Sequence, residues 1–149
     1  MLFYLIYFSK ARTLIGGDGL TNLLNTSRVN NLENGISGML LYMEGRYFSD
    51  YEGRFMQVLE GSEYNVKKLF EKIKLDERHQ GILVLKESFQ VQRNFPDWTM
   101  GFKAINSEEY QKLSGFFQLE DDFLLKGDVP ESNDALDFLR SFYEVSSKL

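Results

Sequence analysis

Two polar side chains interrupt segments that otherwise read as apolar strands, and their chemistry needs an explanation. Gln57 lies at the centre of "FMQVLEG" (55–61), and Tyr7 lies late in the apolar run of residues 2–8. A carboxamide has two N–H donors and an acceptor oxygen, and leaving it without partners in a core costs about 1 to 3 kcal/mol. We therefore expect Gln57 to face a fixed polar ligand or neighbour.

A third polar stretch, "SRVNN" at residues 27–31, ends the first helix that the sequence predicts. Each of the three features has a structural explanation when it is taken alone. A strand tyrosine is usually a core residue with a satisfied hydroxyl, a strand glutamine can bond to water, and neighbouring asparagines commonly end a helix. Only their combination indicates a functional site.

Composition narrows the classes of function. The chain has 149 residues, which is about one domain, and it contains no cysteine and one histidine, His79. Disulfides, thiol nucleophiles and Cys- or His-rich metal sites are therefore not expected, and we expect a cytoplasmic protein. The net charge of -5, without a cluster of Lys or Arg, argues against partners that are nucleic acids or anionic membranes.

The N-terminal segment "MLFYLIYFSK" predicts a first strand. It is apolar for eight residues only and lacks a basic start and a small-residue cleavage site, so it resembles neither a membrane span nor a signal peptide. Both of its alternating side-chain sets are apolar, so both faces of this strand should be covered.

The order of the remaining elements predicts the fold class. A helix over 21–31, capped by Asp18 or Thr21, is followed by strands at 34–43 and 55–61. A second helix opens at Ser62 or Glu63 and runs through 66–78, before strands at 81–89 and 97–105. The order predicts an α+β, ferredoxin-like βαββαβ sheet with an added fifth strand and two helices on one face.

Two further features concern the tail and a near-repeat. We expect residues 1–104 to form the main domain and residues 105–149 a helical extension, which would cover the opposite sheet face or form a dimer surface. The segments 42–50 and 51–61 both carry Glu-Gly-Arg, which allows two hairpin registers. We favour the second copy as the core strand, with the first extending a hairpin or forming a loop.

Taken together, these segments resemble the BLUF domain, the flavin-binding blue-light sensor, over about residues 2–104. Five segments in the family's order carry the resemblance: "LIYFS", "TSRVNNLENGISGMLLY", "FMQVLEG", "LDERHQ" and "RNFPDWTMGF". The longer "EGRYFSDY" stretch departs from the family's usual short hairpin. The tail resembles the helical extension of the short BLUF proteins.

The resemblance also implies roles for individual residues. Tyr7 matches the light-reactive tyrosine that gives an electron and a proton to the excited flavin, and Gln57 matches the glutamine that bridges this tyrosine and the flavin. Asn31 matches an asparagine that hydrogen-bonds the ring edge. The remaining implied FAD-contacting residues are Leu23, Ser27, Asn30, Lys72, Ile73, Asp76, Arg78, His79, Trp98 and Met100.

This reading predicts a photoreceptor rather than an enzyme. Light would drive electron and proton transfer from Tyr7, leave Gln57 rearranged, and produce a small red shift without net turnover. The signal would leave through a downstream protein partner or a change in a homo-oligomer. Two alternatives stay open at this point: a dark flavoprotein and a ligand-free interaction module.

Overall fold

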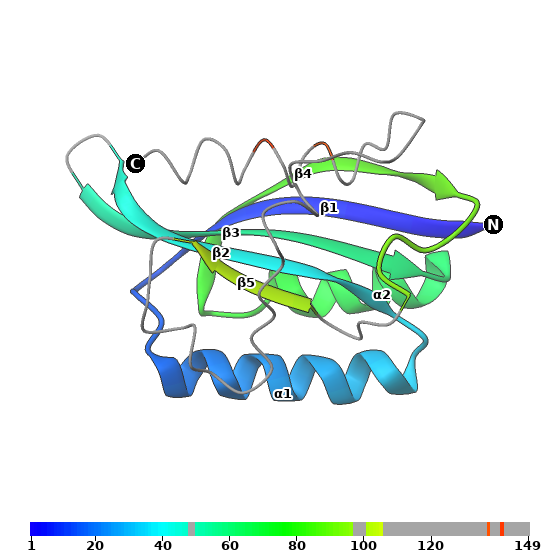
Figure 1. Ribbon diagram of the computed structural model, residues 1–149, viewed down its shortest axis with the longest axis horizontal. Helices are drawn as coiled ribbons and strands as arrows, with labels where there is room; N and C mark the ends of the chain where they lie inside the picture. The colour runs from blue at the N-terminus through cyan, green and yellow to red at the C-terminus, as the bar shows by residue number, and fades with distance from the viewer. Residues whose placement is uncertain (48–49, 97–100, 106–136, 138–140, 142–149) are drawn as a thin grey trace.

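The computed structural model describes residues 1–47, 50–96 and 101–105, together with positions 137 and 141. These residues form a five-stranded sheet with two helices on one face (Figure 1). In chain order the elements are β1 (Leu2–Ala11), α1 (Gly17–Glu33), β2 (Ser37–Tyr47), β3 (Asp50–Gly61), α2 (Glu63–Lys74), β4 (His79–Gln90) and β5 (Gly101–Ile105).

The strand order in the sheet is β4-β1-β3-β2-β5. Strands β1 to β4 pair antiparallel, and β5 joins the edge parallel to β2. This arrangement confirms the predicted ferredoxin-like sheet with an added fifth strand. The predicted C-terminal helices and residues 97–100 of the predicted last strand lie outside the described residues.

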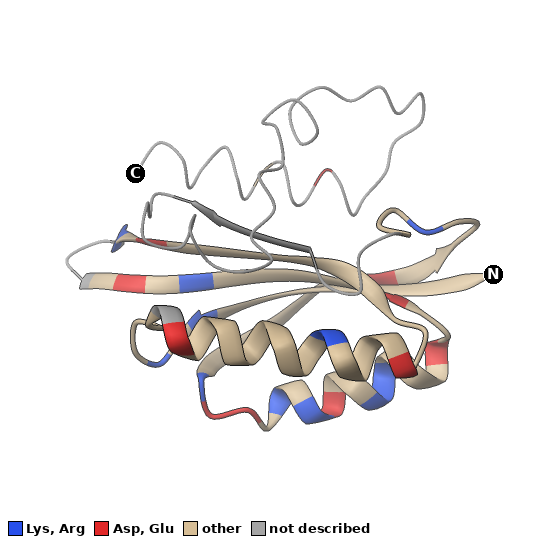
Figure 2. Ribbon diagram, turned by 60° about the horizontal axis from the view of Figure 1, so that its bottom comes forward, with Lys and Arg blue, Asp and Glu red and all other residues tan. Residues whose placement is uncertain are grey.

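Strand β1 lies between β4 and β3 and is buried on both faces, as its two apolar side-chain sets predict. Phe3, Leu5 and Tyr7 belong to the core cluster that packs under the helices. Tyr4 and Ile6, which alternate with them, point to the opposite face and are also buried. Figure 2 shows α1 and α2 side by side beneath the first of these faces.

Helix α2 begins as predicted and ends earlier than predicted. The Ser62 hydroxyl accepts a hydrogen bond from the backbone N–H of Asn65, which caps the helix. The helix ends at Lys74 rather than at Arg78. The reason is local: the Asp76 carboxylate accepts from the backbone N–H of Arg78, and this turn competes with a further helical turn.

Helix α1 begins before the position that the sequence predicts. Its N-cap is Gly16, in an extended conformation and without a side-chain hydrogen bond. The prediction of Asp18 or Thr21 as the cap was therefore wrong, because the backbone of Gly16 alone starts the helix here. The expected apolar side of α1 is present, since Leu20 and Leu24 are fully buried and Leu23 is partly buried.

Strands β2 and β3 form a hairpin that extends past the rest of the sheet. Their pairing continues to Tyr47 opposite Asp50, whereas β1 accompanies β3 only as far as Arg54. The projecting arm is visible at the left of Figure 1. The two copies of the near-repeat pair with each other, with Glu44 opposite Gly53 and Gly45 opposite Glu52. The first copy therefore extends the hairpin, which was one of the two expected outcomes.

Candidate functional site

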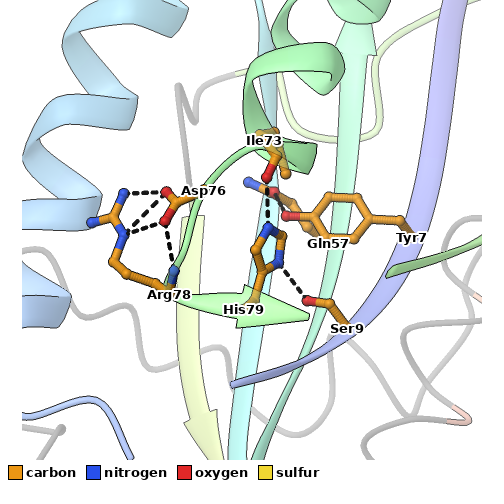
Figure 3. Close-up of polar contacts among 7 residues, drawn as sticks. All are labelled: Tyr7, Ser9, Gln57, Ile73, Asp76, Arg78 and His79. Carbon is orange, nitrogen blue, oxygen red and sulfur yellow. Dashed lines mark hydrogen bonds and ion pairs between the residues drawn. The ribbon is translucent and has the colours of Figure 1, made fainter. Parts of the chain in front are cut away.

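Tyr7 and Gln57 are direct partners in the sheet. They occupy opposite positions in the β1–β3 ladder, and the Tyr7 hydroxyl donates a hydrogen bond to Gln57 Oε1. Their exposed fractions are 4% and 6%. Figure 3 shows the phenol and the carboxamide meeting edge to edge, with the amide nitrogen on the side away from the phenol. The buried amide thus has the polar neighbour that its position requires.

The environment of Tyr7 keeps its hydroxyl neutral. Burial, with a smaller contribution from the negative charge of Asp76, raises the pKa of the Tyr7 phenol well above its ordinary value. The hydroxyl is therefore a hydrogen-bond donor at neutral pH. A proton leaves it readily only when an electron leaves as well, because the phenolate is disfavoured in this environment.

A cavity of about 540 Å³, including its open mouth, lies above this pair. The side chains around it come from both helices, from four strands and from the turn after α2. They are Tyr7, Leu23, Ser27, Asn31, Leu40, Phe55, Gln57, Leu69, Ile73, Asp76, Arg78 and His79.

Helical periodicity explains how the walls form. Leu23, Ser27 and Asn31 follow one another at intervals of four residues, so they lie along one side of α1. Leu69 and Ile73 do the same on α2. The result is a slot between two helices, with apolar side chains from both helices and the polar pair of Tyr7 and Gln57 on the sheet at its floor.

Asn31 adds an acceptor to the α1 side of the slot. It is 1% exposed, and no donor among the described residues bonds to its Oδ1 atom. Buried side-chain oxygens nearly always accept a bond from protein, water or ligand. The position of this oxygen on the cavity wall fits a ligand that carries an N–H group at its edge.

An ion pair lies at the α2 end of the cavity. Arg78 Nη2 lies 2.5 Å from Asp76 Oδ2, and Arg78 Nε donates to the same carboxylate (Figure 3). The hydrogen bond from Arg78 holds the pKa of the Asp76 carboxyl below its ordinary value, while the carboxylate raises the pKa of Arg78. The carboxylate therefore remains an acceptor, and the guanidinium a donor, at neutral pH.

His79 is held by protein groups on both ring nitrogens. Its Nε2 lies 2.6 Å from the carbonyl oxygen of Ile73, which can only accept, so Nε2 carries a proton. Its Nδ1 lies 2.8 Å from the Ser9 hydroxyl, which donates to it when the ring is neutral. The imidazole thus joins β1 to the end of α2 (Figure 3), and His79 is one of the residues that line the cavity.

The structure brings most of the sequence-predicted site residues to one cavity. Asn30 and Lys72 line a smaller neighbouring cavity of about 420 Å³, which shares Asn31 and Leu69 with the first. Trp98 and Met100 lie outside the described residues. Around the main cavity are Tyr7, Leu23, Ser27, Asn31, Gln57, Ile73, Asp76, Arg78 and His79.

Three cavity residues, Leu40, Phe55 and Leu69, were not predicted. Leu69 lies one helical turn before Ile73, and Phe55 lies two residues before Gln57 on the same strand face, so their spacing carried the signal. Leu40 pairs with Gln57 across β2 and β3, which depends on a register that the near-repeat left open.

The residues of the cavity fit a planar heterocycle of the flavin type. Such a ring is apolar on its faces and polar at its edges, which corresponds to apolar helix walls, a carboxamide on the floor and the Asn31 oxygen. Among residues 1–47, 50–96 and 101–105, no three His, Cys, Asp or Glu side chains could hold a metal ion together. No helix in the described part of the chain is long and apolar enough to span a membrane.

Comparison with known proteins agrees with this geometry. The sequence profile of BLUF, described as sensors of blue-light using FAD, matches residues 2–101. The photoactivated adenylate cyclase subunit beta of Euglena longa is 32% identical over 88 residues, which are 59% of this chain and 9% of that protein. Its counterpart in Euglena gracilis is also 32% identical, over 54% of this chain and 8% of that protein. The matched part of this chain spans less than a tenth of these relatives.

Solved structures share the fold. The dark-state structure of BlrB, a BLUF protein, is 29% identical, covers 99% of this chain and 97% of its own, and has a TM-score of 0.65. Klebsiella pneumoniae BlrP1 with FMN and cyclic diGMP is 32% identical, covers 70% of this chain and 26% of its own, and has a TM-score of 0.60. A bacterial light-regulated adenylyl cyclase is 34% identical with a TM-score of 0.62, over 75% of this chain and 31% of its own.

Proposed function

The chain belongs to the BLUF family of blue-light flavin sensors, and from this premise we propose that its light response runs through Tyr7 and Gln57. One observation carries the proposal: a neutral phenol and a carboxamide are hydrogen-bonded to each other at the floor of a cavity whose lining residues fit a flavin. A bound flavin would supply the absorption of blue light and an excited state able to take an electron and a proton.

Tyr7 would be the donor in this step. Its electron and its hydroxyl proton leave together and return together, so the cycle involves no net substrate turnover and the chain acts as a sensor rather than an enzyme. Removing the proton ends the donation to Gln57 Oε1 for the lifetime of the separated state. The carboxamide is then free to rotate or to change tautomer before the proton returns.

Gln57 would store the outcome. A carboxamide can present either its oxygen or its nitrogen to the phenol, and these two arrangements differ in the groups they offer to the flavin edge. Two hydrogen-bond arrangements of similar energy form a bistable element, which light can populate in the less stable form. A new donor at the ring carbonyl would lower the excitation energy and move the absorption band to the red.

The other cavity residues would hold the ring. Leu23 and Ile73 are our candidates for the ring faces, and Asn31 for its edge. Ser27, Asp76 and Arg78 would bond to polar groups of the cofactor, and His79 would position Ile73 and the wall around it. We assign Asn30 and Lys72, in the neighbouring cavity, to the polar side chain of the flavin, and Trp98 and Met100 to the last strand beside it. The description of the family supports FAD as the cofactor.

We propose a separate role for the tail. Residues 1–104 would be the sensor domain, and residues 105–149 a helical extension packed on the sheet face opposite α1 and α2. The burial of Tyr4, Ile6, Met39, Leu41 and Val58, which alternate with side chains under the helices, supports a cover on that face. A protein partner or a second copy of the chain, in the cytoplasm, would read the signal by contact.

Absorption spectroscopy tests the function directly. The purified protein would be measured in the dark, under blue light and during recovery. We expect a flavin band that moves slightly to the red and returns. A band that bleaches or does not move would support a dark flavoprotein instead, and a colourless protein would support an interaction module. Extraction of the cofactor and chromatography against FAD and FMN standards would identify the flavin.

A further inference from the structure

Glu60 is a fully buried acidic residue on β3 that the proposed light response does not use. Four hydrogen bonds converge on its carboxylate, two on each oxygen. Oε1 accepts from Ser37 Oγ at 2.9 Å and from the backbone N–H of Phe95 at 2.6 Å. Oε2 accepts from Gln90 Nε2 at 2.7 Å and from the backbone N–H of Asn94 at 2.8 Å. These contacts satisfy both oxygens completely.

The donors to Glu60 come from separate parts of the sheet. Ser37 begins β2, Gln90 ends β4, and the two backbone donors belong to the segment 91–96 that follows β4. Arg93, in the same segment, donates to Ser37 Oγ at 2.8 Å and to the carbonyl oxygen of Gly35 at 2.6 Å. Glu60 therefore fixes the segment 91–96 against the ends of β2 and β3.

Simple attachment of this segment would not require a charged group. Burying a carboxylate costs desolvation energy, and Phe95, which is 1% exposed, already anchors the segment by an apolar contact. A carboxylate adds directionality, because its oxygens bind two consecutive backbone N–H groups in one orientation. Any displacement of β3 along or across the sheet is then transmitted to the backbone of the segment.

Glu60 and Gln57 lie on the same strand, three residues apart. This odd separation places them on opposite faces of the sheet, so Gln57 faces the cavity and Glu60 the other side. Gln57 is bonded to Tyr7 on β1, and both residues are buried. A change in the hydrogen bond between Tyr7 and Gln57 acts on β3. Near the end of this strand, the four hydrogen bonds of the Glu60 carboxylate form a clamp on the segment 91–96.

We propose that Glu60 is a positioning residue that couples the rearrangement of Gln57 to the segment 91–96, an inference that rests on the proposed light response. In the dark the clamp holds the N–H groups of Asn94 and Phe95 on the carboxylate. In the light the shift of β3 loosens one or both of these bonds. The segment 91–96 is thereby the first part of the sheet face opposite the cavity to change its conformation. The Val91 side chain in this segment is exposed.

Hydrogen exchange on the flavin-loaded protein tests this coupling, with the absorption spectrum recorded on the same sample. In the wild type, illumination should speed the exchange of the Asn94 and Phe95 amides several-fold. Glu60→Gln keeps the shape but replaces one accepting oxygen with a donor. It should retain the red shift, speed the dark exchange of these amides about tenfold and abolish the effect of light on it.

Glu52→Gln is the matched control, because it removes a charge from β3 whose partners are Arg54 and Lys10 rather than the clamp. It should behave as the wild type. If Glu60→Gln does not fold, Ser37→Ala and Gln90→Ala, which each remove one donor, should each reduce the light effect. The proposal is overturned if wild-type exchange at these amides is the same in dark and light, or if the clamp variants keep the full effect. Absence of the red shift in the wild type would instead refute the proposed function.

Discussion

The Tyr7 hydroxyl on β1 is bonded to the side-chain oxygen of Gln57 on β3, although the two residues are 50 positions apart in the chain. The antiparallel register places them directly opposite each other. The geometry of this pair therefore depends on the register of the sheet as well as on the two side chains. It also makes each residue a direct hydrogen-bond partner of the other.

Replacing Gln57 by Leu should keep the bound flavin and abolish the red shift, because an aliphatic side chain has no second hydrogen-bond arrangement. It also leaves the buried Tyr7 hydroxyl without its acceptor, so we expect a loss of about 1 to 3 kcal/mol in the free energy of unfolding. Absorption spectra and urea titrations would measure the two effects. In the double variant with Tyr7→Phe, part of the lost stability should return, and a strictly additive loss would contradict the direct pairing.

Tyr7 should make the stability depend on alkaline pH. Its pKa is raised on folding, so the stabilisation is fully present below the ordinary tyrosine value of 10.0 and is lost as the pH rises toward the folded-state pKa. The difference in unfolding free energy between the wild type and Tyr7→Phe should therefore fall above pH 10, with a slope approaching about 1.4 kcal/mol per pH unit. A difference that stays constant up to alkaline unfolding would show that the hydroxyl is not in a desolvated environment.

Asp76 should make the free energy of unfolding depend on pH in the acidic range. Its pKa is lowered on folding, chiefly by the hydrogen bond from Arg78, so its contribution is present above the ordinary carboxyl value and is lost as the pH falls through the folded-state pKa. Arg78 is exposed and Asp76 is partly buried, so Asp76→Asn should change stability at neutral pH by about 1 kcal/mol or less. Below pH 4 the wild type and the variant should converge in denaturant titrations. If the two proteins differ in stability below pH 4, the pair of Asp76 and Arg78 is not the cause of the loss of stability in acid.

Gly38 should not tolerate a side chain. A Cβ atom at this position would lie 2.0 Å from the backbone oxygen of Val58, so β2 and β3 would have to separate. We expect Gly38→Ala to cost about 3 kcal/mol or more, at the upper end for overpacked cores. Gly16→Ala is the control, because a Cβ there meets no atom within 4 Å. Thermal unfolding would measure the melting temperatures of both variants. Equal values would contradict the close approach of β2 and β3 at Gly38.

Local patterns predicted the elements of the fold well. The two apolar faces of β1, the Ser62 cap of α2 and the helical spacing of Val66 and Phe70 all lead to the observed arrangement. The start of α1 was missed because Gly16 caps it through its backbone, which leaves no side-chain signal. The sequence also placed most of the cavity residues, through the family resemblance rather than through periodicity.

Long-range polar contacts could not be predicted in the same way. The four bonds to Glu60 join residues from β2, β3, β4 and the segment after β4, and none of these pairs has a characteristic spacing. His79 illustrates the same limit. It lines the cavity, but its hydrogen bonds to Ser9 and to the carbonyl of Ile73 have no signal in the sequence.

The near-repeat in the projecting hairpin offers β2 and β3 a second register, which the core has to disfavour. A shift of one residue would place Glu44 opposite Arg54 and Arg46 opposite Glu52, two attractive pairs worth about 0.2 to 1 kcal/mol each. The same shift would turn every side chain of β3 to the other face, including Gln57. Burial of a single side chain such as Leu59 outweighs such a pair, at about 1.5 to 3 kcal/mol. The contacts of β3 with the core therefore favour the observed register, which keeps Gln57 on the cavity side of the sheet.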